Sequence, residues 1–230
     1  MAAELGMRER KKQQTRRLIF DTATRLFAKR GFDAVTVAEV ARVADLSEVT
    51  VFNYFPTKED LFFGGMAFFE ETLLEAVQLR DPGESALAAF RRKLLESPGR
   101  LDSDEGWKAI VKSAPLINAS SALQARERDI VARYTDRLAR ILARETGAPE
   151  DDLEAWTAAS ALMGTHRALV AFVRARALSG QGAATVAADL RTQARRAFRL
   201  LEGGLGAYAV KGSRTRSRVQ RLEARPAATS

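Results

Sequence analysis

The sequence predicts an all-α protein in which a small helix-turn-helix domain precedes a larger helical domain. Apolar residues recur at spacings of three and four along most of the 230-residue chain, which is the period of an amphipathic helix. Ser, Thr, Gly and Pro mark the ends of these segments, as expected where helices begin and stop. Near the N-terminus, two short capped segments are separated by a brief turn, which is the layout of a helix-turn-helix.

The first helix is expected over 11–30, after a flexible basic arm at 1–10. Its apolar face is formed by residues at helical spacing: Leu18, Ile19, Ala23, Leu26 and Phe27. The helix ends in Lys29 and Arg30, and Gly31 follows directly. Basic residues in a last turn with Gly just beyond them form a helix stop.

Two short helices, at 37–43 and about 48–54, form the helix-turn-helix at 36–55. Thr36 opens the first with the capping-box pattern T-x-x-E, and Ser47 is the N-cap of the second. The composition of TVFNYF favours a strand, because β-branched and aromatic residues are enriched in strands. The N-cap before this stretch and the proline after it favour a short helix instead.

The remaining helices are longer and belong to a second domain at 57–206. Their expected ranges follow the apolar period and stop at Gly or Pro: 57–79, 84–95, 104–113, 120–145, 151–178 and 184–205. The third of them is expected to stop before Pro115. The segment 207–230 has many basic residues from Lys211 onward and no apolar period, so a disordered basic tail is expected there. The first domain then covers 11–56.

In a helix-turn-helix, the second helix lies in the DNA major groove and reads bases from its N-terminal end. Its exposed side, the N-cap of the first helix and a lysine beyond the motif provide the predicted DNA-binding residues: Thr36, Ser47, Glu48, Val49, Thr50, Phe52, Asn53, Tyr54 and Lys58. Leu46, Val51 and Phe55 are expected to face inward, and Phe52 lies at the border between the two sides. The alternative is a helical hairpin that only packs, but so short a helix with two caps is poor core material.

Several of these residues suit a particular contact with DNA. Thr36 and Ser47 present hydroxyls and free backbone N–H groups at helix starts, where phosphate oxygens bind well. Asn53 suits an adenine edge, and Val49 offers an apolar surface to a thymine methyl. Glu48 either accepts from a cytosine amino group or only completes the cap and the helix dipole, and the second interpretation is favoured.

Composition favours a polyanionic partner and excludes several classes of enzyme. Lys and Arg exceed Asp and Glu by 37 − 29 = 8, and the pI is about 10.2. The absence of cysteine and the single histidine, His166, exclude disulfides, Cys-ligated zinc, thiol catalysis and a multi-histidine metal site. No glycine-rich phosphate loop is present either, so we predict no enzyme, no cofactor and no metal. Without an apolar run long enough to cross a bilayer or a signal-peptide core, the protein is expected to be cytoplasmic, with no membrane partner.

The stretch GFDAVTVAEVARVADLSEVTVFNYFPTKEDLF at 31–62 resembles the N-terminal domain of the TetR family of bacterial transcriptional regulators. The matching positions run from the Gly after the first helix to a Leu beyond the motif: Gly31, Thr36, Val40, Ala41, Ala44, Leu46, Ser47, Thr50, Val51, Tyr54, Phe55, Lys58 and Leu61. Some residues depart from the family pattern. Asp45 and Val49 stand where Gly is usual or frequent, and Phe52 replaces a common Tyr.

The resemblance implies a transcriptional regulator, most often a repressor, that binds a palindromic operator in double-stranded DNA as a homodimer. It also implies a C-terminal domain that binds a small-molecule effector and dimerises through its last two long helices. The alternatives are an activator of the same family, a DNA-binding protein that needs no ligand, and a monomer with one large core. Candidate ligand-binding residues are Trp107, Tyr134, Met163 and His166. Ordinary core packing is the alternative for them and is favoured for His166.

Gly64 and Gly65 interrupt the helix that is expected to connect the two domains. A glycine costs a helix interior roughly 0.5–1 kcal/mol relative to alanine. One hypothesis is a soft point that lets ligand binding change the spacing of two DNA-reading heads. The alternative, which we favour, is a close helix contact that leaves no room for a side chain.

Overall fold

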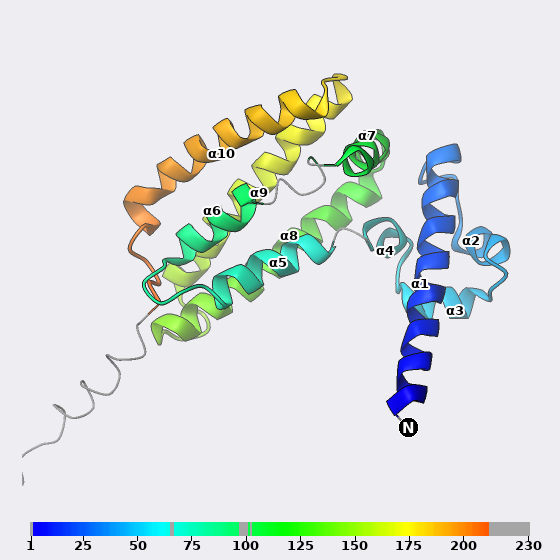
Figure 1. Ribbon diagram of the computed structural model, residues 1–230, viewed down its shortest axis with the longest axis horizontal. Helices are drawn as coiled ribbons and strands as arrows, with labels where there is room; N and C mark the ends of the chain where they lie inside the picture. The colour runs from blue at the N-terminus through cyan, green and yellow to red at the C-terminus, as the bar shows by residue number, and fades with distance from the viewer. Residues whose placement is uncertain (1, 65–66, 97–100, 102, 212–230) are drawn as a thin grey trace, which may run out of the picture.

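The computed structural model describes residues 2–64, 67–96, 101 and 103–211 of the chain. Within these ranges the regular structure is helical, apart from an isolated β-bridge. Figure 1 shows a small N-terminal group of helices around α1 and, beside it, a larger group of longer helices. The predicted all-α class is confirmed.

The N-terminal group contains the helix-turn-helix. Its helices are α1 (Ala2–Arg30), α2 (Val37–Val43), α3 (Glu48–Tyr54) and α4 (Lys58–Phe63). Both predicted short helices are confirmed as α2 and α3. Their N-caps are also the predicted ones, because Thr36 Oγ1 accepts a hydrogen bond from Glu39 N at 3.2 Å and Ser47 Oγ accepts one from Thr50 N at 3.1 Å. Local capping therefore outweighs the strand-like composition of α3.

The C-terminal group is a bundle of longer helices. They are α5 (Ala67–Gln78), α6 (Ala86–Glu96), α7 (Asp104–Ala119), α8 (Ser121–Thr146), α9 (Leu153–Leu178) and α10 (Ala183–Leu205). α8 packs along α9, which also packs against α7 and α10. Ser120 and Gly147 cap the two ends of α8. The helices predicted at 120–145, 151–178 and 184–205 are confirmed, with ends that differ by at most two residues.

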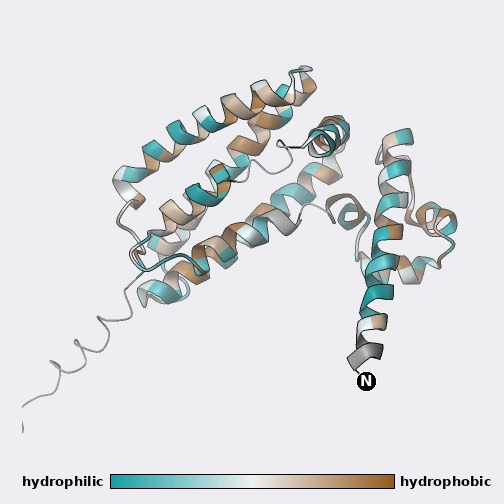
Figure 2. Ribbon diagram, viewed as in Figure 1, coloured by the Kyte–Doolittle hydropathy of each residue, from teal (hydrophilic) through white to brown (hydrophobic). Residues whose placement is uncertain are grey.

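Buried apolar side chains form a continuous core through both groups. Its largest members include Phe27 and Phe55 in the N-terminal group and Phe90 and Phe198 in the C-terminal group. In Figure 2, hydrophobic and hydrophilic colours alternate around most helices, as expected for helices with one face in a core. Among the described helices, none combines the length and the apolar character that a membrane crossing requires.

α1 begins at Ala2, so the prediction of a flexible arm at 1–10 is wrong for 2–10. This segment is rich in Ala, Glu, Leu, Met and Arg, which are strong helix formers, and the helix predicted at 11–30 therefore continues toward the N-terminus. The side chains of 6–14 are exposed, so no packing contact is needed to form this part of the helix.

A single helix was expected over 57–79, but the structure has two, α4 and α5. α4 opens with a complete capping box, in which Thr57 Oγ1 accepts from Asp60 N and the Asp60 carboxylate accepts from Thr57 N, each at 3.1 Å. α4 ends before Gly64, its C-cap, and Gly65 lies outside the described residues. The low helix propensity of glycine explains the break.

α4 packs on α1 through aromatic side chains. The ring centroid of Phe62 lies 6.3 Å from that of Phe27 and 5.9 Å from that of Phe32. The helix-turn-helix is therefore braced by α1 and α4 together. The predicted domains, 11–56 and 57–206, divide the chain just before α4, and this boundary stays a prediction.

The helix predicted at 104–113 extends to Ala119 and passes through Pro115, so the predicted stop is wrong. Proline removes one helical hydrogen bond and usually breaks a helix interior. Pro115 lies on the exposed side of α7, where water can satisfy the carbonyl group that loses its partner.

The chain after α10 has a defined path as far as Lys211, so the prediction of a disordered tail is wrong for 207–211. Val210 forms the β-bridge with Ser85, and Lys211 N donates to the backbone of the same loop. Residues 212–230 lie outside the described part of the chain.

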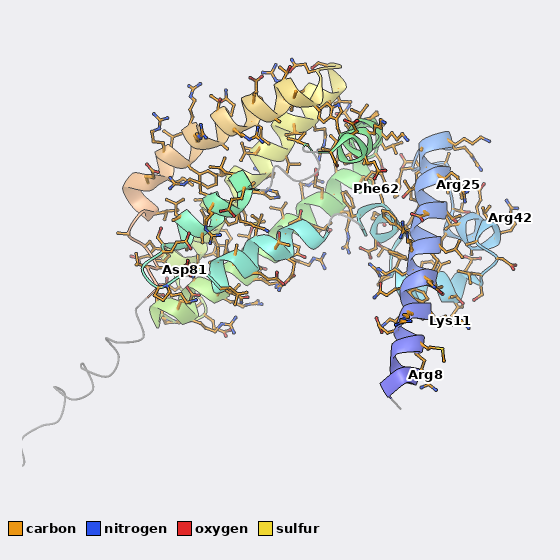
Figure 3. All side chains as sticks on the ribbon, in the orientation of Figure 1. Arg8, Lys11, Arg25, Arg42, Phe62 and Asp81 are labelled. Atoms are coloured by element: carbon orange, nitrogen blue, oxygen red, sulfur yellow. The ribbon has the colours of Figure 1, made fainter. Side chains whose placement is uncertain are left out.

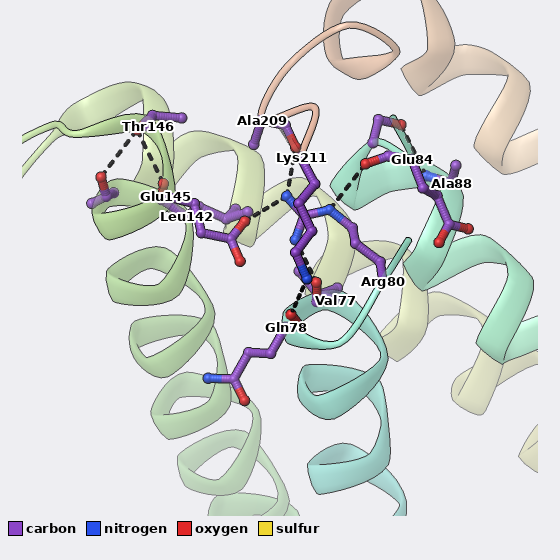
Figure 4. Close-up of polar contacts among 12 residues, drawn as sticks. Val77, Gln78, Arg80, Glu84, Ala88, Leu142, Glu145, Thr146, Ala209 and Lys211 are labelled. Atoms are coloured by element: carbon purple, nitrogen blue, oxygen red, sulfur yellow. Dashed lines mark hydrogen bonds and ion pairs between the residues drawn. The ribbon is translucent and has the colours of Figure 1, made fainter. Parts of the chain in front are cut away.

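A buried arginine holds this C-terminal segment in place (Figure 4). Nη2 of Arg80 donates to Ala209 O at 2.6 Å and to the Glu145 carboxylate at 2.5 Å, and its Nε donates to Glu84 O at 3.1 Å. Glu84 is close to Arg80 in the sequence, but Glu145 and Ala209 are 65 and 129 residues away, so no local pattern predicted these two contacts.

Candidate DNA-binding site

The turn between α2 and α3 is a Schellman motif centred on Asp45. Asp45 has a φ of 56°, and its N–H donates to Arg42 O at 3.3 Å, while Leu46 N donates to Ala41 O at 2.9 Å. After glycine, Asp and Asn are the residues that adopt this left-handed conformation most readily. Asp45 therefore preserves the turn although it replaces the usual glycine.

The inner side of α3 is fixed by packing. Val51 is fully buried, and Phe55, the C-cap of α3, is 2% exposed. Arg16 of α1 donates to Tyr54 O at 2.9 Å, and its guanidinium lies 4.4 Å from the centroid of the Phe55 ring. The inward predictions for Val51 and Phe55 are confirmed, and Leu46 is half-buried and packs against the same core. Arg16 was not predicted as an anchor, because its partner lies 38 residues away and leaves no local signal.

The outer side of α3 carries most of the predicted DNA-binding residues. Its exposed and half-buried side chains are Ser47, Glu48, Val49, Thr50, Phe52, Asn53 and Tyr54. Val49 and Phe52 are 70% and 43% exposed, although both are apolar. All seven are at least partly accessible to solvent, but Tyr54 is half-buried and packs against the core.

Thr36 and Lys58 lie outside α3. Thr36 is exposed at the start of α2. Lys58 is half-buried, and its Nζ donates to Asp33 O at 3.4 Å and lies 4.3 Å from the centroid of the Phe32 ring. Lys58 therefore adjoins the loop before α2, not the outer side of α3.

Positive charge is concentrated on α1, whereas α3 itself has no basic residue. The stretch 8–17, RERKKQQTRR, is strongly basic. Figure 3 shows Arg8 and Lys11 on the part of α1 that extends beyond α3, and Arg42 on α2. Because Arg16 contacts Tyr54 O, this basic stretch adjoins the C-terminal end of α3. Arg42, an exposed cation beside the turn, is a residue that the sequence analysis did not select.

Three of the four predicted ligand-binding residues lie in the main core. Tyr134, Met163 and His166 are 8%, 0% and 4% exposed. Trp107 is half-buried and packs against a separate small cluster formed by Leu101, Val186 and Ala187. Their role in binding a ligand stays a prediction.

Charged groups of α5 lie near two of these core residues. His166 Nε2 is 3.8 Å from Glu70 Oε1, and both side chains are largely buried. Burial raises the pKa of Tyr134, and the carboxylates of Glu71 and Glu70 raise it further. Arg137 donates two hydrogen bonds of 2.6 Å to Glu71. The His166–Glu70 contact between α9 and α5 is thus largely buried, whereas the Arg137–Glu71 pair lies at the surface of the bundle.

A cavity of about 400 Å³ lies elsewhere, between the start of α9 and the end of α10. It is lined by Leu153, Glu154, Thr157, Ala158, Gly204, Leu205 and Tyr208. None of the four predicted ligand-binding residues lines this cavity. In the described part of the chain, no group of three or more His, Cys, Asp or Glu side chains is placed to hold a metal ion.

Comparisons with known proteins place this geometry in a family. The sequence pattern of the bacterial regulatory proteins of the tetR family matches residues 19–64. The transcriptional regulator TcmR of Streptomyces glaucescens is 29% identical over 151 residues, which cover 64% of this chain and 67% of TcmR. The transcriptional repressor KstR of Rhodococcus jostii is 28% identical over 156 residues, which cover 66% of this chain and 72% of KstR.

A solved structure has the same fold. NalD, the secondary repressor of the MexAB-OprM multidrug efflux pump in Pseudomonas aeruginosa, superimposes with a TM-score of 0.51. The match covers 82% of this chain and 97% of NalD at 16% identity, and at that identity it shows the fold alone.

A short helix that is fixed on one side, open on the other and preceded by a Schellman turn defines a helix-turn-helix DNA-binding protein. Residues 19–64 match the helix-turn-helix of the TetR family, and the chain is similar to DNA-binding transcriptional regulators of that family. The resemblance drawn from 31–62 is confirmed.

Proposed function

We propose that this regulator is a ligand-responsive repressor that binds a palindromic operator as a homodimer. The observation that carries the proposal is the outer side of α3, where apolar and amide side chains face solvent on a helix that is firmly anchored from within. A rigid helix with an exposed reading face suits the major groove.

Base reading is assigned to the outward residues of α3. Asn53 is exposed and suits the N6 and N7 atoms of an adenine, and Val49 suits a thymine methyl. The Ser47 and Thr50 hydroxyl oxygens are 2.8 Å apart, so this pair meets the DNA as a unit near a phosphate. Glu48 stays assigned to the cap of α3, in keeping with its place in the first turn.

The basic part of α1 is assigned to the phosphate backbone beside each half-site. It is helical and exposed, and it adjoins the end of α3 through Arg16. Contacts of this kind depend strongly on salt, because each neutralised phosphate releases counterions. Replacing Lys11 and Lys12 by Gln is expected to weaken binding to all sequences alike and to reduce the salt dependence. A salt dependence equal to that of the wild type would contradict the assignment.

Exposed apolar side chains at adjacent ends of α9 and α10 support a dimer. Leu153, Trp156 and Leu200 are 74%, 52% and 86% exposed. Large exposed apolar groups on neighbouring helices are typical of a surface that another chain covers, and palindromic operators call for two-fold proteins. We expect light scattering to give a dimer for the wild type and a monomer for Leu200→Glu. A monomeric wild type at micromolar concentration would rule out this assembly.

Repression is supported by relatives such as KstR, whose name describes a repressor. A repressor must leave its operator when an effector binds, and the helical C-terminal group provides a separate body in which an effector can bind. Deleting the gene for this protein is expected to raise transcription from the promoter that the operator controls. If the protein is an activator, the deletion lowers transcription instead.

The direct test is selection of DNA from random duplexes by the purified protein. We expect a palindromic sequence to be enriched. Asn53→Ala should weaken binding to that duplex by about 1–3 kcal/mol, while Asn118→Ala, a change of the same kind at the exposed end of α7, should not. If the two variants bound the duplex with equal affinity, the assignment of base reading to α3 would be wrong.

A further inference from the structure

Two acidic residues flank the helix-turn-helix, and the start of α8 binds both of them. Asp33 precedes the Thr36 N-cap of α2, and Asp60 lies in the first turn of α4, just beyond α3. Their partners, Ser120 and Arg126, belong to the N-cap and the second turn of α8. A single short segment of the C-terminal group therefore contacts the DNA-binding group on both sides of the motif.

The first contact is a hydrogen bond between a buried hydroxyl and an exposed carboxylate. Ser120 is 2% exposed, and its Oγ donates to Asp33 Oδ1 at 2.8 Å. The same oxygen accepts from Leu123 N at 3.4 Å, as the N-cap of α8. The start of α8 is therefore tied directly to the loop that leads into α2.

In the second contact, the two carboxylate oxygens of Asp60 accept hydrogen bonds from different elements. Asp60 Oδ1 accepts from Arg126 Nη2 at 2.6 Å, while Oδ2 accepts from Thr57 N at 3.1 Å and from Thr57 Oγ1 at 2.8 Å. The side chains of Arg126 and Asp60 are 23% and 21% exposed, so solvent screens this ion pair less than one at the surface. The residue that caps α4 is thus also held by α8.

The contact continues into the bundle at the next residue. Arg174 of α9 donates from Nη1 to Glu127 Oε2 at 3.0 Å and from Nη2 to Glu127 Oε1. Consecutive residues of α8, Arg126 and Glu127, therefore link α4 to α9. The α9 contact is therefore made by the residue directly after the one that binds Asp60.

We propose that Ser120, Arg126 and Glu127, here called the α8 clamp, couple the C-terminal group to the orientation of the helix-turn-helix. The proposal rests on the proposed function, because it concerns how an effector signal reaches α3. Coupling of binding free energies is reciprocal, so if an effector in the C-terminal group changes operator affinity, operator binding acts on the C-terminal group in return. The coupling can therefore be measured with DNA alone.

The experiment is hydrogen–deuterium exchange with and without the selected operator duplex. It compares the wild type, Arg126→Gln and the control Arg137→Gln, which removes an equal charge from the same helix and breaks the solvent-exposed Arg137–Glu71 pair between α8 and α5. Allosteric coupling commonly amounts to roughly 5–150-fold, so we expect operator to slow exchange near Arg174 by about fivefold in the wild type. The control should respond equally, and Arg126→Gln should respond by less than about twofold while still binding the duplex.

A second variant guards against a folding defect in Arg126→Gln. Asp33 is exposed in a loop, so Asp33→Ala breaks the other contact and leaves Ser120 in its capping role. It should reduce the operator response near Arg174 as well. The proposal is overturned if the wild type binds operator without any change in α9, or if both clamp variants respond as the wild type does. If the wild type enriches no duplex in the selection, it is the proposed function that fails.

Discussion

The candidate functional residues of α3 lie mainly on its exposed side, whereas those of α9 lie in the core. α3 is seven residues long, with Val51 buried and most of its other side chains open to solvent. α9 is 26 residues long, and its candidate residues, Met163 and His166, are inside the core. The residues on the exposed side of a helix can be predicted from the sequence of that helix. The role of residues inside a bundle depends on partners that are distant in the sequence.

The largest expected effect is a difference in protein stability between substitutions on the buried and exposed sides of α3. Phe55→Ala should lower the free energy of unfolding by about 3–5 kcal/mol, because a buried ring that packs under Arg16 is lost. Phe52→Ala should change it by only about 0.5 kcal/mol, because Phe52 is on the exposed side. Urea unfolding of both variants measures the difference, and equal losses would show that α3 has no distinct inner side.

The next prediction concerns α9. Met163→Ala should cost about 2–5 kcal/mol if Met163 is a packed core residue, because the truncation leaves a cavity. If Met163 instead lines a ligand cavity in the free protein, its loss should cost much less. Urea unfolding decides between packing and ligand binding, and a cost under about 1 kcal/mol would support the ligand-binding prediction for this residue.

Substitution of Gly64 tests how closely the chain is packed at the junction between the two groups of helices. A Cβ atom at Gly64 would lie 2.6 Å from Phe55 Cε1 and 2.8 Å from Asp60 O, so Gly64→Ala should destabilise the protein by about 1–3 kcal/mol. Gly203→Ala in α10 has no neighbour within 4 Å and should stabilise by roughly 0.5–1 kcal/mol.

This pair of variants separates the two hypotheses for Gly64. The short distances support the close contact that we favoured over a soft point. Thermal unfolding in which Gly64→Ala stabilises the protein like Gly203→Ala would reverse that preference.

The smallest expected effect is the pH dependence of the Asp60–Arg126 pair. Burial raises the pKa of Asp60, but hydrogen bonds from Arg126 and Thr57 and the charge of Arg126 outweigh burial and lower it below 3.8. The stabilisation is therefore complete above the ordinary carboxyl pKa and is lost as the pH falls through the lowered pKa.

The wild type should accordingly be more stable than Arg126→Gln at pH 7, and the difference should shrink in strong acid. Urea unfolding across this pH range provides the measurement. A difference that stays constant down to pH values well below 3.8 would show that the ion pair does not stabilise the fold.

Residues with local signals were the most predictable. The caps Thr36, Ser47 and Thr57 hydrogen-bond within their own first turns, so the bounds of α2 and α3 followed from spacing alone. Contacts between distant segments left no such pattern, and Arg16 and Arg80 were therefore not recognised as anchors.

Helix ends without strong caps were the least predictable. The N-terminal extension of α1 depends on weak helix propensities, and the passage of α7 through Pro115 depends on solvent exposure. The spacing of apolar residues indicates neither of them. The ligand site was harder still, because Trp107 and Met163 can be assigned to clusters only once the bundle is packed.

The central claim is that the outer side of α3 reads DNA bases, and selection of duplexes by Asn53→Ala tests it most directly. The account predicts that the variant enriches the wild-type palindrome with the preference lost at one symmetric pair of positions, because one side chain per protomer is removed. An enriched sequence identical to that of the wild type at every position would contradict the claim.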